Sequence, residues 1–354
     1  MGRTKRALVA SAFATTAVCG TMGCGSGAQS VGPSAPKATT LATTSGSSLR
    51  APETVSAVTA PAGPPFFPHT LFTSGQVASW PLDPNSATIV ANLVSDYKTE
   101  YGSVGVNSLP LYSVPAKEAQ VPLRVTPGCN NFLPSTGRRI PVPPYVSLNG
   151  SGDNPLVIYQ PSTGWDWELW QTARSPLGGY QACWGGKLNV RRSSGIFPWP
   201  FGLSATGISY LATAITQADV ASGQIDHALA LEGPDCNGFV YPADRGDCAT
   251  DPGQPAEGQW FRLPADLPVP RGLGLFARMV FVALQKYGAV ITDRSGAVMI
   301  QEEQPVDWGA EGHRGLAPTV LAWAGQPEFA VVANLPWSQL QVVDPPQLSA
   351  LTSP

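Results

Sequence analysis

The six residues Trp165–Trp170 (WDWELW) place three indoles and two carboxylates in one short segment. Side chains alternate between the two faces of a β-strand, so Asp166, Glu168 and Trp170 would share one face of a strand here. An indole can stack on the apolar face of a sugar ring, and neighbouring carboxylates can bond hydroxyl groups or transfer protons. The segment therefore predicts carbohydrate as the substrate class.

The spacing of Asp166 and Glu168 is compatible with cleavage of a glycosidic bond. Residues in a strand rise about 3.3 Å each, so carboxyl groups two positions apart lie roughly 5–7 Å from one another. Retaining glycosidases use about 5–5.5 Å between the two carboxyl groups and inverting ones about 6.5–9.5 Å. The alternative is a solvated strand face on which Asp166 serves a turn begun by Thr163 and Gly164.

A second set of candidate residues lies in the expected strand 224–231. His227 falls on its apolar face, and Asp226 faces the other way. His227 is either a buried, hydrogen-bonded core residue or a proton carrier in a cleft. Asp226 is an alternative to Asp166 as the acid/base partner of Glu168.

Two more tryptophans are candidates for substrate binding beside Trp170. Trp184 precedes a Gly-Gly pair, and Trp199 lies between two prolines. Either indole could form a stacking platform for a sugar, or both could belong to the core. Gly-x-Ser-x-Gly elbows, P-loops and dinucleotide fingerprints do not occur, so serine hydrolase chemistry has no sequence support.

No cofactor is expected, with a structural calcium ion as the one alternative. Asp244, Asp247 and Asp251 crowd the loop around Cys248, and extracellular acidic loops can hold Ca²⁺, although the spacing fits no EF-hand. A polar loop held by a disulfide explains the same residues. Zinc is disfavoured because there is no CxxC and the three histidines are far apart.

The N-terminus predicts export. Residues 2–6 form a basic n-region, residues 7–22 a moderately apolar h-region, and residues 21–24 (TMGC) resemble a lipobox. We therefore expect residues 1–24 to be a lipoprotein-type signal with lipid on Cys24, ordinary secretion and a retained anchor being the alternatives. Residues 25–65, rich in Ser, Thr, Pro and Gly, are expected to be a disordered tether. The membrane would be contacted only through the lipid.

Cysteine usage agrees with an oxidising compartment. Apart from Cys19 and Cys24, four cysteines remain, an even number that predicts two disulfides in an exported chain. Three pairings are possible. We favour the pairs Cys236–Cys248 and Cys129–Cys183.

Composition favours β-structure. The 36 prolines and 37 glycines favour strands and turns, and a net charge of −3 without a basic stripe argues against nucleic-acid binding. We expect helices at 86–98, 204–216 and 273–287, and strands at 156–160, 167–172, 180–190, 224–231, 259–263, 289–293, 297–301 and 329–332. The expected fold is a two-sheet β-sandwich of jelly-roll or concanavalin-like type at 155–345, with two or three peripheral helices. A helix and a wrapping arm at 66–154 precede it.

Several short motifs resemble a family of exported, actinobacterial-type lipoproteins with the pattern GxIxHAL…PA…RL…ALxxYG…D. They are Gly223–Leu229, Tyr241–Ala243, Gln259–Leu263, Ala283–Gly288 and Asp293–Gly296, within a region from about Pro81 to Val332. The resemblance implies export and a concanavalin-like sandwich, and it implies no particular reaction. Residues 152–155 lack the histidine that the family carries upstream of the Trp167–Trp170 strand.

These observations predict an exported surface protein that acts on polysaccharide or cell-wall glycan. A glycoside hydrolase would use Glu168 with Asp166 or Asp226 as its carboxyl pair. The alternative is a non-catalytic module that binds glycan through its indoles, or a structural envelope lipoprotein.

Overall fold

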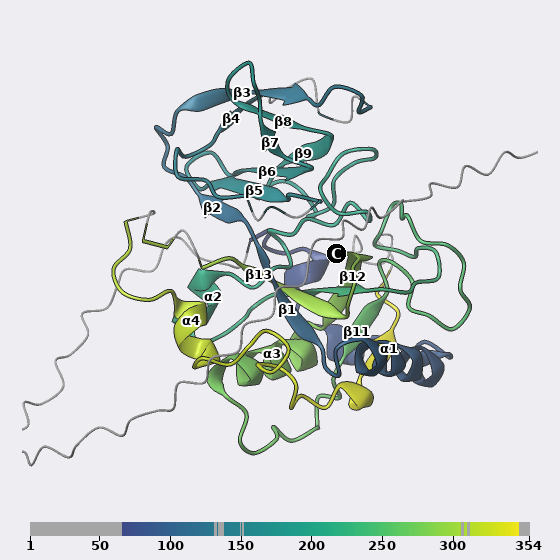
Figure 1. Cartoon of the computed structure of the whole chain (residues 1–354). Helices are drawn as coiled ribbons and strands as arrows, with labels where there is room; N and C mark the ends of the chain where they lie inside the picture. Colours follow the sequence, from purple (N-terminus) through teal and green to yellow (C-terminus); the bar gives the residue numbers. More distant parts are fainter. Residues whose placement is uncertain are drawn as a thin grey trace, which may run out of the picture. The chain divides into compact units, whose positions relative to one another are not determined.

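The computed structural model describes residues 66–130, 133, 138–148, 150, 152–305, 308–309 and 312–346. The expected signal peptide with Cys24 and the expected tether lie outside the described residues. Within them the protein is mainly β, with three sheets and few helices (Figure 1). The α-helices are α1 (Ser86–Glu100), α2 (Gln217–Ser222), α3 (Leu275–Lys286) and α4 (Pro318–Trp323). The 3-10 turns are η1 (Leu71–Thr73), η2 (Val77–Ser79) and η3 (Trp337–Gln339).

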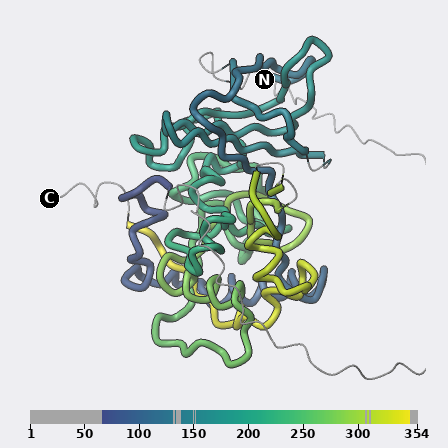
Figure 2. The backbone as a smooth tube through the Cα atoms, turned by 90° about the vertical axis from the view of Figure 1, so that its left-hand side faces the viewer, coloured from purple at the N-terminus to yellow at the C-terminus, as the bar shows by residue number. Residues whose placement is uncertain are grey.

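The strands form one six-stranded and two four-stranded sheets. The first sheet has the order β1 (Gly105–Leu109), β13 (Met299–Glu303), β10 (Leu229–Gly233), β12 (Ala289–Arg294), β11 (Trp260–Arg262), β14 (Gln341–Val343). The second has the order β2 (Leu111–Ser113), β5 (Leu156–Gln160), β6 (Trp165–Trp170), β9 (Trp184–Asn189). The third has the order β4 (Arg139–Pro141), β3 (Gln120–Val125), β8 (Tyr180–Ala182), β7 (Ala173–Arg174). The backbone of the last two sheets belongs to the blue-to-teal part of the tube in Figure 2.

Both faces of the first sheet are buried. Leu229 and Leu231 pack with α1 and α3 in one hydrophobic cluster, and Ala230 belongs to a second cluster on the opposite face. Buried residues of α3 recur at positions three and four apart, which is the spacing of one helix face. Gly288 ends the helix at φ +77°, where a Cβ atom would lie 2.5 Å from the Phe261 carbonyl oxygen. The chain can therefore turn directly from α3 into β12 only at a glycine.

The second sheet shares apolar clusters with each of the other two sheets. In β5, Val157 and Tyr159 belong to the cluster that contains Ala230, and Leu156 and Ile158 belong to the cluster of the third sheet. A strand buried on both faces reads as a nearly continuous apolar run, and β5 is buried at all of its positions, with only its last residue, Gln160, strongly polar. The second sheet is therefore an inner layer, and one face of β6 is turned toward the first sheet.

Residues 66–154 were expected to wrap the main domain, and they instead build part of each sheet. Only Pro110 separates β1 in the first sheet from β2 in the second, and its carbonyl oxygen accepts a hydrogen bond from Val157 N at 2.8 Å. This segment and residues 155–346 fall in one compact unit.

The mainly β class is confirmed, and the two-sheet sandwich is not. A jelly roll is antiparallel, whereas β1–β13, β10–β12, β2–β5 and β3–β8 are parallel pairs. Parallel neighbours need crossover connections, and α3 lies in the one between β10 and β12. Strand periodicity reveals which residues extend, but not which strands become neighbours.

Most expected elements are present, with two clear errors. Residues 204–216 form turns and bends and not a helix, and two of their residues pair with distant segments, Ile208 with Ile196 and Ile215 with Glu302. Residues 329–332 are turns and not a strand. Strand 224–231 begins only at Leu229, and the six-residue helices α2 and α4 were not predicted.

Both expected disulfides are present, Cys129–Cys183 and Cys236–Cys248. The first ties the loop after β3 to Cys183, the residue between β8 and β9, and the second closes the loop that follows β10. Among the described residues no helix is both long and apolar enough to cross a bilayer.

Candidate functional site

A cavity of about 530 Å³ lies beside the ends of β10 and β12. This volume is typical of sites for small molecules or for a few sugar units. Its wall combines three indoles with several carboxyl groups, the residue types that the sequence had indicated for sugar binding. The indoles belong to Trp170, Trp184 and Trp199, and the acids are Asp153, Glu232, Asp247 and Asp293.

The three tryptophans come together although they are distant in sequence. Trp170 ends β6 and Trp184 begins β9, and the antiparallel pairing places these two residues opposite each other. Their indole N–H groups are bonded within the protein, to Asp153 Oδ1 at 3.1 Å and to the Pro200 carbonyl oxygen respectively. Trp199 is 67% exposed. Any ligand would therefore meet ring surfaces rather than the N–H groups of the first two indoles.

Glu232 and Asp293 form a carboxyl pair at this cavity. They are register partners on the parallel strands β10 and β12, next to a register shift between Leu231 and Glu232. Glu232 Oε1 accepts a hydrogen bond from Tyr210 Oη at 2.5 Å. Asp293 Oδ2 accepts one from Ala205 N at 2.9 Å, and its Oδ1 accepts one from Arg294 N at 2.8 Å.

Burial changes the acidity of both groups. It raises the pKa of the Glu232 carboxyl to about 7. Burial and the charge of Glu232 raise the pKa of Asp293 well above its usual value. Interacting carboxyl groups titrate as a pair, so this pair retains a proton at pH values where isolated carboxyl groups have lost theirs. Such a pair can supply an acid and a base to the same substrate.

The pair expected to be catalytic, Asp166 and Glu168, lies elsewhere. Both project from the face of β6 that carries Trp170, as alternation predicts, but both are 0% exposed and neither lines the cavity. Ser209 Oγ donates to Glu168 Oε1 at 2.7 Å and lies 3.3 Å from Asp166 Oδ2, and Leu211 N donates to Glu168 Oε1 at 3.1 Å.

Asp166 and Glu168, called the sealed pair below, hold a segment whose middle residue, Tyr210, lines the cavity. Burial raises the pKa of Glu168 to about 7, and burial together with the charge of Glu168 raises that of Asp166. The segment 209–211 is bonded to Glu168 through Ser209 and Leu211, and to Glu232 through Tyr210. A catalytic role for the sealed pair stays a prediction, and a substrate cannot touch either carboxyl group in this conformation.

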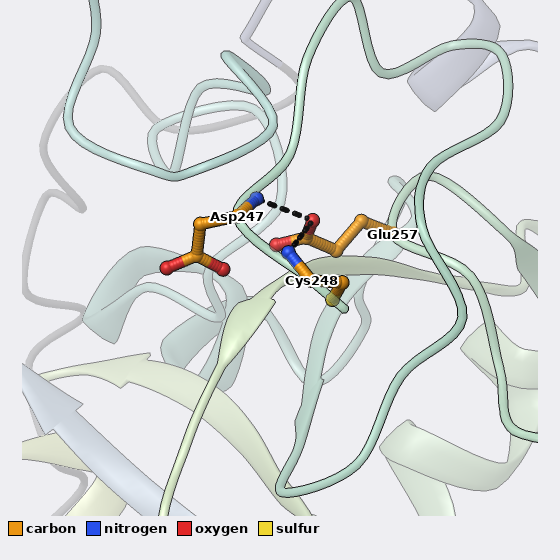
Figure 3. A group of neighbouring side chains, drawn as sticks. All are labelled: Asp247, Cys248 and Glu257. Atoms are coloured by element: carbon orange, nitrogen blue, oxygen red, sulfur yellow. Dashed lines mark hydrogen bonds between the residues drawn. The ribbon is translucent and has the colours of Figure 1, made fainter. Parts of the chain in front are cut away.

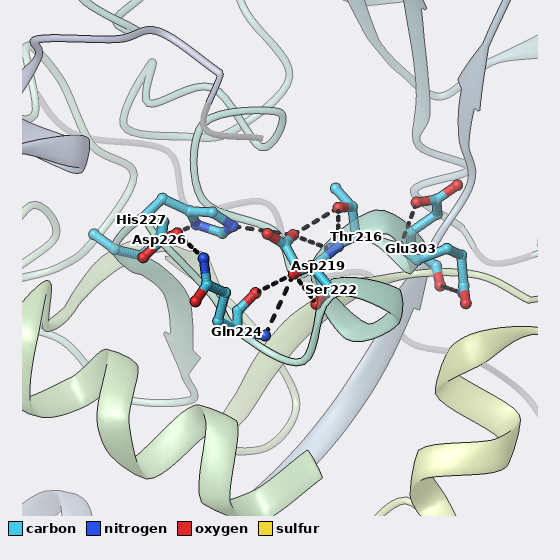
Figure 4. A network of polar contacts seen from close by, with 9 residues as sticks. Thr216, Asp219, Ser222, Gln224, Asp226, His227 and Glu303 are labelled. Atoms are coloured by element: carbon cyan, nitrogen blue, oxygen red, sulfur yellow. Dashed lines mark hydrogen bonds and ion pairs between the residues drawn. The ribbon is translucent and has the colours of Figure 1, made fainter. Parts of the chain in front are cut away.

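His227 and Asp226 also lie outside the cavity lining. They belong to a network of polar contacts near Asp219 (Figure 4). His227 is 1% exposed, with Nε2 3.2 Å from Asp219 Oδ2 and Nδ1 2.8 Å from the Ala228 carbonyl oxygen. Burial lowers its pKa, but the charge and hydrogen bond of Asp219 outweigh that effect and raise it overall. Asp226 accepts from Gln224 Nε2 at 2.7 Å and from Tyr287 Oη at 3.0 Å. The buried-histidine interpretation is therefore the one that the structure supports.

The acidic loop around Cys248 is organised by Glu257 (Figure 3). Glu257 is 0% exposed, and its Oε2 accepts from Asp247 N at 3.0 Å and Cys248 N at 3.4 Å. Burial raises the pKa of Glu257 to about 7. Asp247, Cys248 and Glu257 lie within metal-ligand reach of one another, but the sulfur of Cys248 is committed to a disulfide. Asp244 instead pairs with Arg245 at 2.9 Å, and calcium binding stays a prediction.

The sequence reasoning identified the indoles of this site and missed its carboxyl pair. Glu232 is the single charged residue in the apolar run 228–233, and an isolated acid in a buried strand is a signal that could have identified it. Asp293 had been noted only as part of the motif Asp293–Gly296. Comparison of the chain with family models, curated proteins and solved structures found no match.

Proposed function

We propose that this protein binds a glycan in the indole-lined cavity and cleaves a glycosidic bond with Glu232 and Asp293. One observation carries the proposal: two carboxyl groups on adjacent strands, Glu232 buried and Asp293 half-buried, line a cavity whose wall bears three indoles. Indoles suit sugar rings because they offer a large apolar face, and carboxyl pairs are the usual machinery of glycoside hydrolysis.

The chemistry needs one carboxylic acid and one carboxylate. Neighbouring strands are about 4.8 Å apart, a little less than the roughly 5–5.5 Å between the carboxyl groups of retaining glycosidases, so a pair on adjacent strands suits the retaining mechanism best. The protonated member would donate its proton to the leaving oxygen as the C–O bond breaks, while the ionised member attacks the sugar carbon and forms a glycosyl ester. A water molecule, giving its proton to the first carboxylate, would then hydrolyse that ester and restore both groups. Tyr210, which donates to Glu232, fixes the orientation of that carboxyl group.

An extracytoplasmic location, with lipid on Cys24, belongs to the same proposal. Two disulfides are typical of chains that fold in oxidising compartments. Cys24→Ser would then move the protein from the membrane fraction to the medium or leave its signal uncleaved. An unmodified mature terminus at another residue, found by mass spectrometry, would exclude the anchor.

The test of catalysis is product analysis after incubation with a panel of polysaccharides and oligosaccharides. We expect new reducing ends and shortened products with the wild type and none with Glu232→Gln. Glu302→Gln is a matched control, because Glu302 is a buried glutamate on β13 that does not line the cavity. No product from any glycan, together with measurable binding, would support the non-catalytic alternative.

That alternative has one observation in its favour. Glu232 is only 5% exposed, so a bound sugar has limited access to its carboxyl group without some adjustment of the wall. In a pure binding module both Glu232→Gln and changes of the indoles would affect affinity alone.

A further inference from the structure

The cavity wall carries more acidic than basic side chains. It contains the four carboxyl groups already named and two guanidinium groups, those of Arg245 and Arg294. Arg245 is held by Asp244 at 2.9 Å and by the Phe201 carbonyl oxygen. Arg294 Nη2 lies 3.4 Å from the Pro234 carbonyl oxygen. Asp244 offsets the charge of Arg245, so the carboxylates of Asp153 and Asp247 outweigh the one remaining cation of the wall, Arg294, and favour a positively charged guest.

A buried acceptor in the same wall lacks a donor. Gln301 lines the cavity, is 3% exposed, and its Oε1 has no hydrogen-bond partner in the described part of the chain. Its side chain bonds the carboxyl group of Glu232, which uses the amide N–H and leaves the carbonyl oxygen as an acceptor. Buried polar atoms are nearly always satisfied, so an unpaired acceptor at a cavity points to a donor on the ligand.

The indoles of the cavity wall also favour a positively charged ligand. The face of a tryptophan ring attracts ammonium groups through its quadrupole, and tryptophan is the strongest of the aromatic residues in this respect. A wall of carboxylates, an unpaired carbonyl oxygen and indole faces therefore suits a ligand that combines sugar rings with N–H-bearing positive charge.

We propose that the glycan bound by this cavity carries free amino groups, so that the preferred ligands are oligosaccharides of de-N-acetylated amino sugars. This inference rests on the proposed glycan function and specifies its substrate class. Asp153 and Asp247, both exposed at the cavity wall, would face the ammonium groups, with Gln301 Oε1 as the buried acceptor.

Binding of such a ligand would release protons. An ammonium group near Glu232 favours its ionised form, and that carboxyl group is only partly ionised near pH 7 because burial raises its pKa to about 7. Titration calorimetry at pH 6, where the amines are already charged and Glu232 is mostly protonated, measures this release directly when it is run in two buffers of different ionisation enthalpy. A neutral sugar would give little difference between the two buffers.

The decisive experiment compares three tetrasaccharides with the same β-1,4 backbone, built from glucosamine, N-acetylglucosamine or glucose. Each is titrated into the full oxidised chain at pH 6, where the amines are charged. We expect the glucosamine tetramer to bind at least about tenfold more tightly than the other two. The advantage should shrink at high salt, since screening weakens charge attraction.

Two variants test which carboxylates cause the preference for the amine. Asp153→Asn keeps the oxygen that accepts from Trp170 Nε1 and removes only the charge, and Asp247→Asn removes the other exposed charge. Each should reduce the preference for the amine, and the two changes together should reduce it to about threefold or less. Asp251→Asn is the matched control, an exposed aspartate of the neighbouring loop that does not line the cavity.

The outcomes separate the two proposals. If the N-acetylated or the neutral tetramer binds as tightly as the amine, glycan binding stands and the amino-sugar inference is overturned. If no tetramer and no polysaccharide of the panel binds, both proposals fall. The inference would also be overturned if Asp251→Asn reduced the amine preference as much as Asp247→Asn does. The preference would then reflect the net charge of the protein and not the cavity wall.

Discussion

Two pairs of carboxyl groups lie on either side of the segment 209–211, and they differ in what surrounds them. Asp166 and Glu168 come from one strand, are 0% exposed, and bond Ser209 and Leu211. Glu232 and Asp293 come from two strands and open onto the cavity. Burial raises the pKa of both glutamates to about 7, so acidity alone does not distinguish a reactive pair from a structural one. The two pairs differ in whether a ligand can reach them.

The largest expected effect is on turnover. Glu232→Gln should lower the rate of glycan cleavage about 10²–10⁴-fold while leaving affinity within about tenfold, because the amide keeps the shape of the side chain but cannot cycle a proton. Glu168→Gln should change the rate far less. Initial rates and titration calorimetry on both variants measure the two quantities. The reverse result, with Glu168→Gln inactive and Glu232→Gln active, would identify the sealed pair as catalytic.

The next effect is on stability. Glu168→Ala removes the acceptor of Ser209 Oγ and Leu211 N in a sealed interior, and it should lower the free energy of unfolding by about 2–4 kcal/mol. Urea unfolding gives this value. Glu328→Ala, at an exposed position, is the control and should change it by no more than about 0.5 kcal/mol. A loss below about 1 kcal/mol for Glu168→Ala would show that the sealed pair does not hold the segment in place.

Both pairs should make the protein less stable as the pH rises. The pKa of Glu168 and of Glu232 is raised from 4.5 to about 7, so between these pH values the folded state keeps protons that the unfolded state has lost. Stability contributed by the protonated forms is complete below pH 4.5 and is lost as the pH approaches 7. Glu168→Gln should reduce the decline between pH 5 and 7 by about 1–2 kcal/mol, since one pKa unit corresponds to about 1.4 kcal/mol. Urea unfolding across that range would contradict the expectation if stability were constant or increased.

The smallest effect concerns the rim of the cavity. Trp199→Ala should weaken glycan binding about tenfold and leave stability nearly unchanged, because this indole is 67% exposed and contributes contact area only to a ligand. Leu177→Ala provides the control, since Leu177 is 76% exposed and lies outside the cavity lining. If Trp199→Ala and the wild type bound every glycan with equal affinity, Trp199 would not be part of the binding site.

The same two pairs show how far the sequence could predict the site. Asp166 and Glu168 are adjacent in one strand, so their common face follows from the backbone period. Glu232 and Asp293 are partners only because β10 and β12 lie side by side, and that pairing depends on a crossover through α3 that local patterns do not specify.

Local sequence patterns predicted those parts of the fold that depend on neighbouring residues alone. Helices α1 and α3, the strand β6 and both disulfide pairings were predicted because each shows a clear period, cap or spacing. The six-residue helices α2 and α4 are too short to show a helical period. The division into three sheets depends on long-range neighbours, and the same limitation concealed the carboxyl pair.

The disulfide Cys236–Cys248 bears on how active material should be prepared. It closes the loop that carries Arg245 and Asp247, two residues of the cavity wall, while all three sheets lie outside that loop. Protein produced in a reducing host is therefore expected to give the circular dichroism spectrum of a folded, β-rich protein. The loop that carries Arg245 and Asp247 would nevertheless not be held in its position at the cavity. Correct folding would then be a poor guarantee of a competent preparation. A free-thiol titration that shows this cysteine pair to be oxidised is the quality check that should precede any negative result with a glycan.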